Sequence, residues 1–367
     1  MQAFGAWLVR VPRNPGGSRD YGGEPTMKRA FPHGSGTRMN PSLALASLLL
    51  VGPACLQESD HASPLAVVQT IALPGVEGRF DHAAYDPATH RLFFAALGNG
   101  SLEVVDTQAG ARVHSIERLK KPTGVLWLPD SKQLVVACGN EGTVRFYDGA
   151  SYELQGSVNK LDDADNLRFD RPANRVYVGY GEGALGVIDP ETRTLVASIA
   201  LQAHPEAFQL ETQGKRIFVN VPDAQHVAVV DREQAKVIET WPLGEFHSNF
   251  PMALDEAGQR LYIGCRRPAR LLVLDTQSGK VASDHALRGD IDDFVLLHET
   301  QRLFASCGEG FLDSFRLPTE GGPIARNPST PTARGARTCF HFPKENWLCV
   351  AVPRYGDQGA ELRFYGL

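Results

Sequence analysis

Polar and ionisable side chains recur in this sequence at intervals of about 42 residues, and their types are those that bind ions and small ligands. Carboxylate and amide oxygens are the ligands that Ca²⁺ or Mg²⁺ prefers, which makes Glu206, Asn249 and Asp292 a candidate metal set. Imidazole nitrogens would suit a transition metal instead. The candidate ligand-binding residues are Arg79, Asp81, His82, Asp165, His204, Glu206, Asn249, Arg266, Arg267, Asp292, Asp293, Arg337 and Arg354.

The arginines in this set could clamp a carboxylate or phosphate through bidentate hydrogen bonds. The alternative is that they pair with neighbouring carboxylates such as Asp292, Asp293 and Glu309 and serve only the fold. The chain has no C-x-x-C pair, Walker loop or G-x-S-x-G elbow, so no local motif assigns a reaction.

Two repeated patterns predict the elements that position these residues. An apolar pair followed by an aspartate recurs at spacings of 41 to 44, at Asp106, Asp148, Asp189, Asp231 and Asp275. Upstream of each lies a short β-branched or aromatic run, such as RLFFAAL from Arg91 and RVYVGYG from Arg175. Such runs, bounded by turn residues, are typical of strands. We expect the repeated aspartates to cap turns.

Each repeat contains four strand patterns, and the chain carries seven repeats, so the fold class is all-β: a seven-bladed β-propeller with four antiparallel strands per blade. The seventh repeat stops after its third strand, at Leu367. We expect residues 65–73 (LAVVQTIAL) to supply the missing strand and close the ring. The propeller would then span 65–367, with the polar residues gathered at the mouth of its central channel.

The N-terminal region predicts export. Residues 1–26 look like a gene-model extension before a second start at Met27; Lys28 and Arg29 then precede an apolar run over 43–51. This is the layout of a signal peptide, which we place in 1–55. Cys55 sits where a bacterial prolipoprotein carries its lipidated cysteine; cleavage after Ala54 without lipidation, or no export, are the alternatives. Residues 56–64 would form a tether.

Composition and charge narrow the classes of function. The chain is 43% hydrophobic, which excludes a disordered protein. The net charge is −5, and residues 1–55 carry six basic and two acidic residues, so the remainder carries −9. An acidic domain of this kind is not expected to bind nucleic acid.

Several strings resemble those of YVTN/YncE-like propellers of bacterial envelopes: GRFDH from Gly78, PMALDE from Pro251, RLYIGCR from Arg260 and AVPRYG from Ala351. The resemblance covers about residues 65–367. It implies a secreted or lipid-anchored protein, periplasmic or attached to the membrane, and assigns no reaction.

Two functions follow as hypotheses. The first is a monomeric binding module that takes a small ligand or an envelope protein on its channel face and touches the membrane only through a lipid anchor. The second is a metal-dependent lactonase of the gluconolactonase type, in which Glu206, Asn249 and Asp292 would hold Ca²⁺ or Mg²⁺ to polarise a lactone carbonyl.

Overall fold

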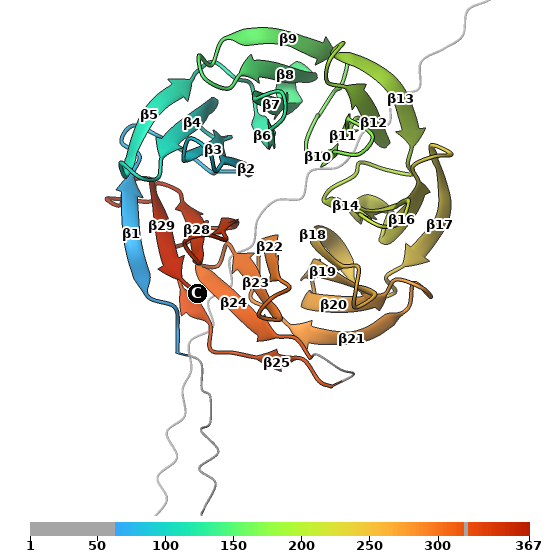
Figure 1. Cartoon of the computed structure of the whole chain (residues 1–367). Helices are drawn as coiled ribbons and strands as arrows, with labels where there is room; N and C mark the ends of the chain where they lie inside the picture. The colour runs from blue at the N-terminus through green and yellow to red at the C-terminus, as the bar shows by residue number, and fades with distance from the viewer. Residues whose placement is uncertain (1–62, 319–321) are drawn as a thin grey trace, which may run out of the picture. The chain divides into compact units, whose positions relative to one another are not determined.

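Seven antiparallel sheets stand in a ring, as the computed structural model shows (Figure 1). The structure describes residues 63–318 and 322–367. The expectations for the signal peptide, for Cys55 and for residues 56–62 of the tether fall outside this part of the chain. No helix in the described part is long and apolar enough to cross a membrane.

The predicted seven blades are confirmed. Within each blade four strands lie side by side, from the innermost, at the channel, to the outermost, at the rim, and blade six has a fifth short strand. Blade one consists of β2 (Ala83–Asp86), β3 (Arg91–Ala96), β4 (Ser101–Asp106) and β5 (Ala111–Ile116); blade two of β6 (Pro122–Leu128), β7 (Gln133–Cys138), β8 (Thr143–Asp148) and β9 (Leu154–Asn159); and blade three of β10 (Leu167–Asp170), β11 (Arg175–Tyr180), β12 (Ala184–Asp189) and β13 (Thr194–Ala200). Blade four consists of β14 (Phe208–Leu210), β15 (Arg216–Val221), β16 (His226–Asp231) and β17 (Lys236–Pro242), and blade five of β18 (His247–Asp255), β19 (Arg260–Arg267), β20 (Ala269–Asp275) and β21 (Val281–Ala286). Blade six consists of β22 (Ile291–Leu297), β23 (Arg302–Cys307), β24 (Phe311–Arg316) and β25 (Ala325–Arg326), with β26 (Thr330–Pro331) beside β24, and blade seven of β27 (Thr338–Phe342), β28 (Trp347–Val352), β29 (Glu361–Gly366) and β1 (Val67–Ala72). Short 3-10 turns, η1 (Gly139–Glu141) and η2 (Pro222–Ala224), follow β7 and β15.

The two middle strands of each blade are buried on both faces because neighbouring blades pack against them. Phe93 of β3, for example, is fully buried and stacks on Trp127 of the next blade with ring centroids 5.7 Å apart. The outermost strands are mostly exposed or half-buried, as in β5. The core is therefore a series of apolar layers between blades, which explains why the middle strands read as continuous hydrophobic runs.

The repeated aspartates cap the turns between the third and fourth strands of a blade, as predicted. Asp231 shows the pattern: its Oδ1 accepts hydrogen bonds from the backbone N–H groups of Glu233 (3.0 Å) and Gln234 (2.9 Å). These bonds favour the ionised form and lower the pKa of Asp231. The same arrangement recurs at Asp106, Asp148, Asp189 and Asp275.

The N-terminal strand closes the ring. β1 pairs antiparallel with β29, and Ile71 lies opposite Leu362. Ile71 is 1% exposed and packs in one core cluster with Phe364 and with Leu92 of blade one. The strand expected from residues 65–73 therefore completes blade seven and covers the edge of β29.

Blade six departs from the regular repeat. Its outermost strand is broken into the two-residue strands β25 and β26, which both pair with β24. Pro323, Pro328 and Pro331 lie in or beside this segment, and a proline cannot donate a backbone hydrogen bond to a ladder. Asp313, fully buried in β24, holds the broken strand instead by an ion pair with Arg326 at 2.7 Å.

Ring closure makes a quantitative prediction for Ile71. Replacing Ile71 with alanine should lower the free energy of unfolding by about 2–5 kcal/mol, because the side chain is buried between the first and last strands. Chemical denaturation of the full-length chain would measure this.

Val113→Ala is the matched control, since Val113 lies in an outer strand and is 47% exposed. Its cost should stay within about 0.5 kcal/mol. Equal costs for the two variants would contradict the closing role of β1.

Candidate functional site

Residues at or near the start of the innermost strands, together with Arg266 near the end of β19, line a cavity of about 200 Å³ at one mouth of the channel, and they come from six of the seven blades. Eight of the predicted residues lie together here: Arg79, Asp81, His82, Asp165, His204, Glu206, Arg266 and Asp292. Lys121, Asp163, Asn166, Ala207 and Phe250 complete the lining. The repeat thus brings residues more than 200 positions apart in the sequence into one site.

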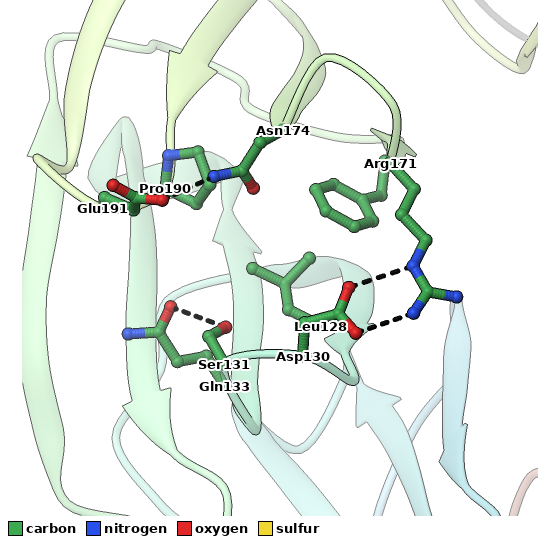
Figure 2. A pocket seen from close by; sticks show the side chains of 9 residues that line it. Leu128, Asp130, Ser131, Gln133, Arg171, Asn174, Pro190 and Glu191 are labelled. Carbon is green, nitrogen blue, oxygen red and sulfur yellow. Dashed lines mark hydrogen bonds and ion pairs between the residues drawn. The ribbon is translucent and has the colours of Figure 1, made fainter.

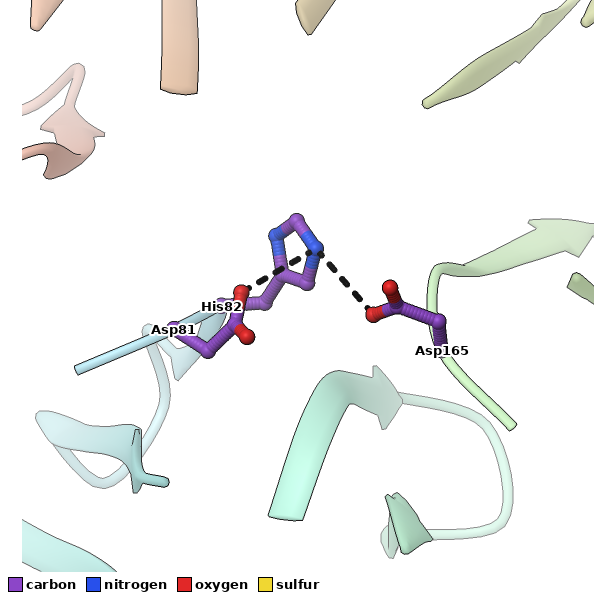
Figure 3. Close-up of side chains that lie close together, drawn as sticks. All are labelled: Asp81, His82 and Asp165. Carbon is purple, nitrogen blue, oxygen red and sulfur yellow. Dashed lines mark ion pairs between the residues drawn. The ribbon is translucent and has the colours of Figure 1, made fainter. Parts of the chain in front are cut away.

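His82 lies between two carboxylates that come from different blades (Figure 3). Its Nε2 is 3.6 Å from Oδ1 of Asp81 and 4.0 Å from Oδ1 of Asp165, too far for a hydrogen bond to either. Burial, together with the nearby Arg168 and Arg79, lowers the pKa of His82 to about 4. The imidazole is therefore neutral at pH 7, with a nitrogen lone pair available to a ligand.

Four of the five predicted arginines are held in ion pairs, as the second of the two alternatives drawn from the sequence supposes. Arg266 pairs with Asp292, donates to the carbonyl of Ile291 at 2.8 Å and stacks 3.8 Å above the ring of Phe250. Arg79 lies 3.3 Å from Asp81. Arg337 binds Asp290 at 2.6 Å, and Arg354 pairs with Glu77. Their guanidinium groups are thus engaged by the protein's own carboxylates.

Acidic groups outnumber lysine and arginine in the cavity. Its lining holds five carboxylates against three cations. Arg79, Lys121 and Arg266 contact Asp81, Asp163 and Asp292, so the described residues leave Asp165 and Glu206 with no lysine or arginine partner. Burial and the neighbouring Asp292 raise the pKa of Glu206 to about 8. Burial, with Asp81 and Glu206 nearby, raises the pKa of Asp165 well above its usual value.

Blade two fixes the position of Asp165. A side chain at Gly124 would place its Cβ 2.2 Å from the carbonyl oxygen of Asp165, so glycine is required for this close approach. The hydroxyl of Thr123 donates to the carbonyl of Ala164 at 2.8 Å. Asn166 next to it is 3% exposed, and its Oδ1 has no hydrogen-bond partner among the described residues.

His204 is oriented by the backbone. Its Nδ1–H donates to the carbonyl of Gly181 at 2.7 Å. The bond fixes the tautomer and leaves the lone pair on Nε2. Asp163, whose backbone is left-handed (φ 51°), pairs with Lys121 beside it.

The other predicted residues lie outside this cavity. Asn249 is fully buried and donates through Nδ2 to Oδ1 of Asn220 (2.9 Å) and to the carbonyl of His226 (3.2 Å), joining blades four and five. Of the predicted metal set, Glu206 and Asp292 line the cavity and Asn249 does not, while the Oδ1 of Asn249 has no hydrogen-bond partner among the described residues. Arg267 is exposed at the end of β19.

Asp293 lines a second cavity, of about 280 Å³, with Arg168, Cys339 and His341. His82 lines both cavities, so they adjoin at this residue. Burial raises the pKa of Asp293 to about 7, although the backbone N–H of Cys339 donates to it at 3.1 Å.

Sequence reasoning missed Asp163 and Phe250. Asp163 stands just before the predicted strand start of blade three, and Phe250 just after that of blade five, so neither belonged to the set read at the strand starts. The short distance of each from a predicted residue, Asp165 and Asn249, was the only available signal.

A third cavity, of about 360 Å³, lies between blades two and three, on the face formed by the other set of hairpin loops (Figure 2). Its polar groups satisfy one another: Arg171 makes a bidentate pair with Asp130, and Asn174 donates to Glu191 at 2.8 Å. Both members of the Arg171–Asp130 pair are about two-thirds exposed. This cavity therefore lacks the uncompensated, desolvated charge of the channel mouth.

Comparison with known proteins shows the fold. No family model matches the chain, and neither does any curated protein. A solved structure of hydrazine synthase from Kuenenia stuttgartiensis is similar with a TM-score of 0.67 and 14% identity, over 76% of this chain and 95% of that chain. A chain of the mitotic checkpoint complex gives a TM-score of 0.69 and 14% identity, over 89% and 99%. The similarity supports a β-propeller.

The pairing of Arg266 predicts a structural cost for its removal. Arg266→Ala should lower the free energy of unfolding by about 2 kcal/mol, between the costs for exposed and for buried ion pairs, because Asp292 loses its partner. Removing both charges in Arg266→Ala/Asp292→Asn should restore part of this loss. Urea denaturation would measure it, and an unchanged stability in the single variant would instead show a guanidinium free to bind a ligand.

The raised pKa of Glu206 predicts a pH-dependent stability. The carboxyl is protonated in the folded protein up to about pH 8, whereas its ordinary pKa is 4.5, so folding loses stability as the pH rises through this window. Glu206→Gln removes that loss. In EDTA, its Tm should match the parent's at pH 5 and exceed it by several degrees at pH 9, at about 2–4 °C per kcal/mol.

Glu153→Gln, on the exposed surface of blade two, is the control and should follow the parent at both pH values. A Glu206→Gln variant that is no more stable than the parent at pH 9 would show that the carboxylate is compensated.

Proposed function

We propose that this protein is a binding module that takes a small cationic ligand in the cavity at the channel mouth. We further propose that it is an exported bacterial protein of the YVTN/YncE-like group, monomeric, periplasmic or anchored to the membrane by lipid on Cys55. The export signal expected in residues 1–55 supports the second part, and the cavity supports the first.

One observation carries the choice of a cation: Asp165 and Glu206 line the cavity with no lysine or arginine ion pair among the described residues, and the imidazole 4.0 Å from Asp165, that of His82, is neutral. Buried charges in proteins are ordinarily paired or bound to a metal. The arginines that could have attracted an anion are already engaged by Asp81, Asp292 and other carboxylates. A ligand that brings positive charge would complete the site.

The alternative function is a metal-dependent lactonase. It is favoured by the same excess of carboxylates, which suits a metal able to polarise a carbonyl. The lining residues include no hydroxyl or thiol nucleophile, so such an enzyme would need a metal-bound water to attack its substrate. EDTA-sensitive hydrolysis of a simple lactone by the purified protein would support the enzyme, and its absence would remove this alternative.

The binding function predicts a charge-selective response. Full-length protein, stripped with EDTA, would be heated with 1,4-diaminobutane, with divalent metal salts, or with citrate or phosphate. At about 100 times its dissociation constant, a cation that binds the cavity should stabilise the fold by about 2.7 kcal/mol, while the two anions should leave the Tm unchanged.

The double variant Asp165→Asn/Glu206→Gln should lose this stabilisation, because it removes both uncompensated charges. Asp130→Asn is the matched control: it removes a carboxylate from the opposite face and should keep the response. Stabilisation by anions alone, or an undiminished cation response in the double variant, would overturn the proposal.

A further inference from the structure

Two donor sets in the cavity share Asp165: one adds Asp81 and His82, and the other, from blades three and four, adds His204 and Glu206. Asp81 of the first set is paired with Arg79, which leaves the second set without an arginine partner. Asp165, His204 and Glu206 each offer one ligand atom, and these atoms lie within 4.8 Å of one another. Ligand atoms bound to one metal at 2.0–2.2 Å are about 3–4 Å apart, so small side-chain rotations would bring the three to a common ion.

The orientation of His204 is the kind that metal-binding histidines show. Such histidines usually donate one ring N–H to a carbonyl or carboxylate and bind the metal through the other nitrogen. The Nδ1–H of His204 donates to the Gly181 carbonyl at 2.7 Å, which reserves Nε2. The side chain is 22% exposed, so an ion can reach it from solvent.

A second, independent feature points to a bound ligand. Asn166 lines the same cavity, is 3% exposed, and its Oδ1 has no hydrogen-bond partner among the described residues. A buried amide oxygen without a partner costs free energy unless a donor or a cation satisfies it. His82, neutral and with its Nε2 4.0 Å from Asp165, adds a second imidazole beside the set.

The chemistry of the donors selects the class of ion. Ca²⁺ takes six to eight oxygen ligands and Mg²⁺ keeps a nearly octahedral oxygen shell, whereas imidazole nitrogen favours Zn²⁺ and its first-row neighbours. Neither Asp165 nor Glu206 has an ion pair with a lysine or arginine among the described residues, so both carboxyl groups are open to a divalent ion.

We propose that the channel mouth holds one divalent first-row transition-metal ion, of which Zn²⁺ is the probe, bound by Asp165, His204 and Glu206. This inference rests on the proposed cation-binding function and names its ligand class. It replaces the oxygen-only set of Glu206, Asn249 and Asp292 with a mixed nitrogen and oxygen set that spans the boundary between two blades. The cavity leaves room for water or a small ligand on the ion.

The test is calorimetric titration of the EDTA-stripped full-length chain with Zn²⁺, Ca²⁺ and Mg²⁺. Cys55→Ser serves as the background, so that this thiol cannot take the metal. One equivalent of Zn²⁺ should bind, at least 100-fold more tightly than Ca²⁺ or Mg²⁺. His204→Gln should weaken Zn²⁺ by at least about 100-fold, because loss of a ligand should cost no less than the 10–100-fold typical of its outer-shell partners.

His247→Gln is the matched control, since His247 lies at the start of β18, the innermost strand of the next blade, but does not line the cavity. It should bind Zn²⁺ as the parent does. Co²⁺ substitution adds a spectroscopic measurement: its visible bands should shift in His204→Gln and stay unchanged in His247→Gln.

The outcomes separate the two proposals. Stoichiometric Zn²⁺ binding lost in His204→Gln supports both. If 1,4-diaminobutane binds through Asp165 and Glu206 but Zn²⁺ does not bind, the proposal of a metal site is wrong, and the proposal of a cation-binding site is supported. Equal affinity in His204→Gln and the parent, or tighter Ca²⁺ than Zn²⁺, also overturns the metal. If no cation binds, both proposals are wrong.

Discussion

The pairing of the first strand with the last is the contact on which the rest of this structure depends. β1 and β29 come from opposite ends of the propeller, and their shared ladder converts seven separate sheets into a closed ring. Only in a closed ring do the innermost strands of all blades converge on one axis. The cavity draws residues from six blades, so its geometry depends on a closure made at the rim, by residues that touch none of its lining.

Within that ring, the carboxylates differ in whether a lysine or arginine pairs with them. This difference distinguishes the cavity at the channel mouth from the other cavities. Most carboxylates near the channel are neutralised locally by arginine or lysine, including Asp81, Asp163 and Asp292. Asp165 and Glu206 remain uncompensated in a desolvated position, which is unfavourable in the empty protein. A site that is unfavourable alone and favourable with a cation is well suited to binding one.

Much of the fold could be predicted from the sequence because each repeat consists of short runs of strand-forming residues separated by turn residues. The repeated aspartates predicted turn caps, and the apolar runs predicted buried strands. The seventh repeat, which ends after its third strand at Leu367, predicted ring closure by an N-terminal strand. The structure agrees with all three predictions. The broken strand of blade six was harder to predict. Its prolines indicate that backbone donors are missing from the ladder, but they do not determine the path of the chain after the break. For the site, the sequence predicted many of the lining residues but not how their side chains are arranged.

That limit has a physical cause. Position within the repeat says which residues reach the channel mouth, but side-chain direction and partner choice depend on neighbouring blades. Asn249 has the right type and place, yet it turns into a hydrogen-bond network with Asn220. Arg266 likewise turns to Asp292 and Phe250. Asp163 and Phe250 escaped prediction because they stand slightly away from the repeated positions.

The turn-capping aspartates have a consequence for the electric dipole of the ring. Their backbone hydrogen bonds lower the pKa on the face of the third-to-fourth-strand turns, whereas burial raises the pKa of the channel carboxylates on the opposite face. As the pH falls, Asp165 and Glu206 therefore take up protons before the turn-capping aspartates do. This difference changes the balance of charge between the two faces of the ring, so acidity affects how the protein lies beside a charged surface.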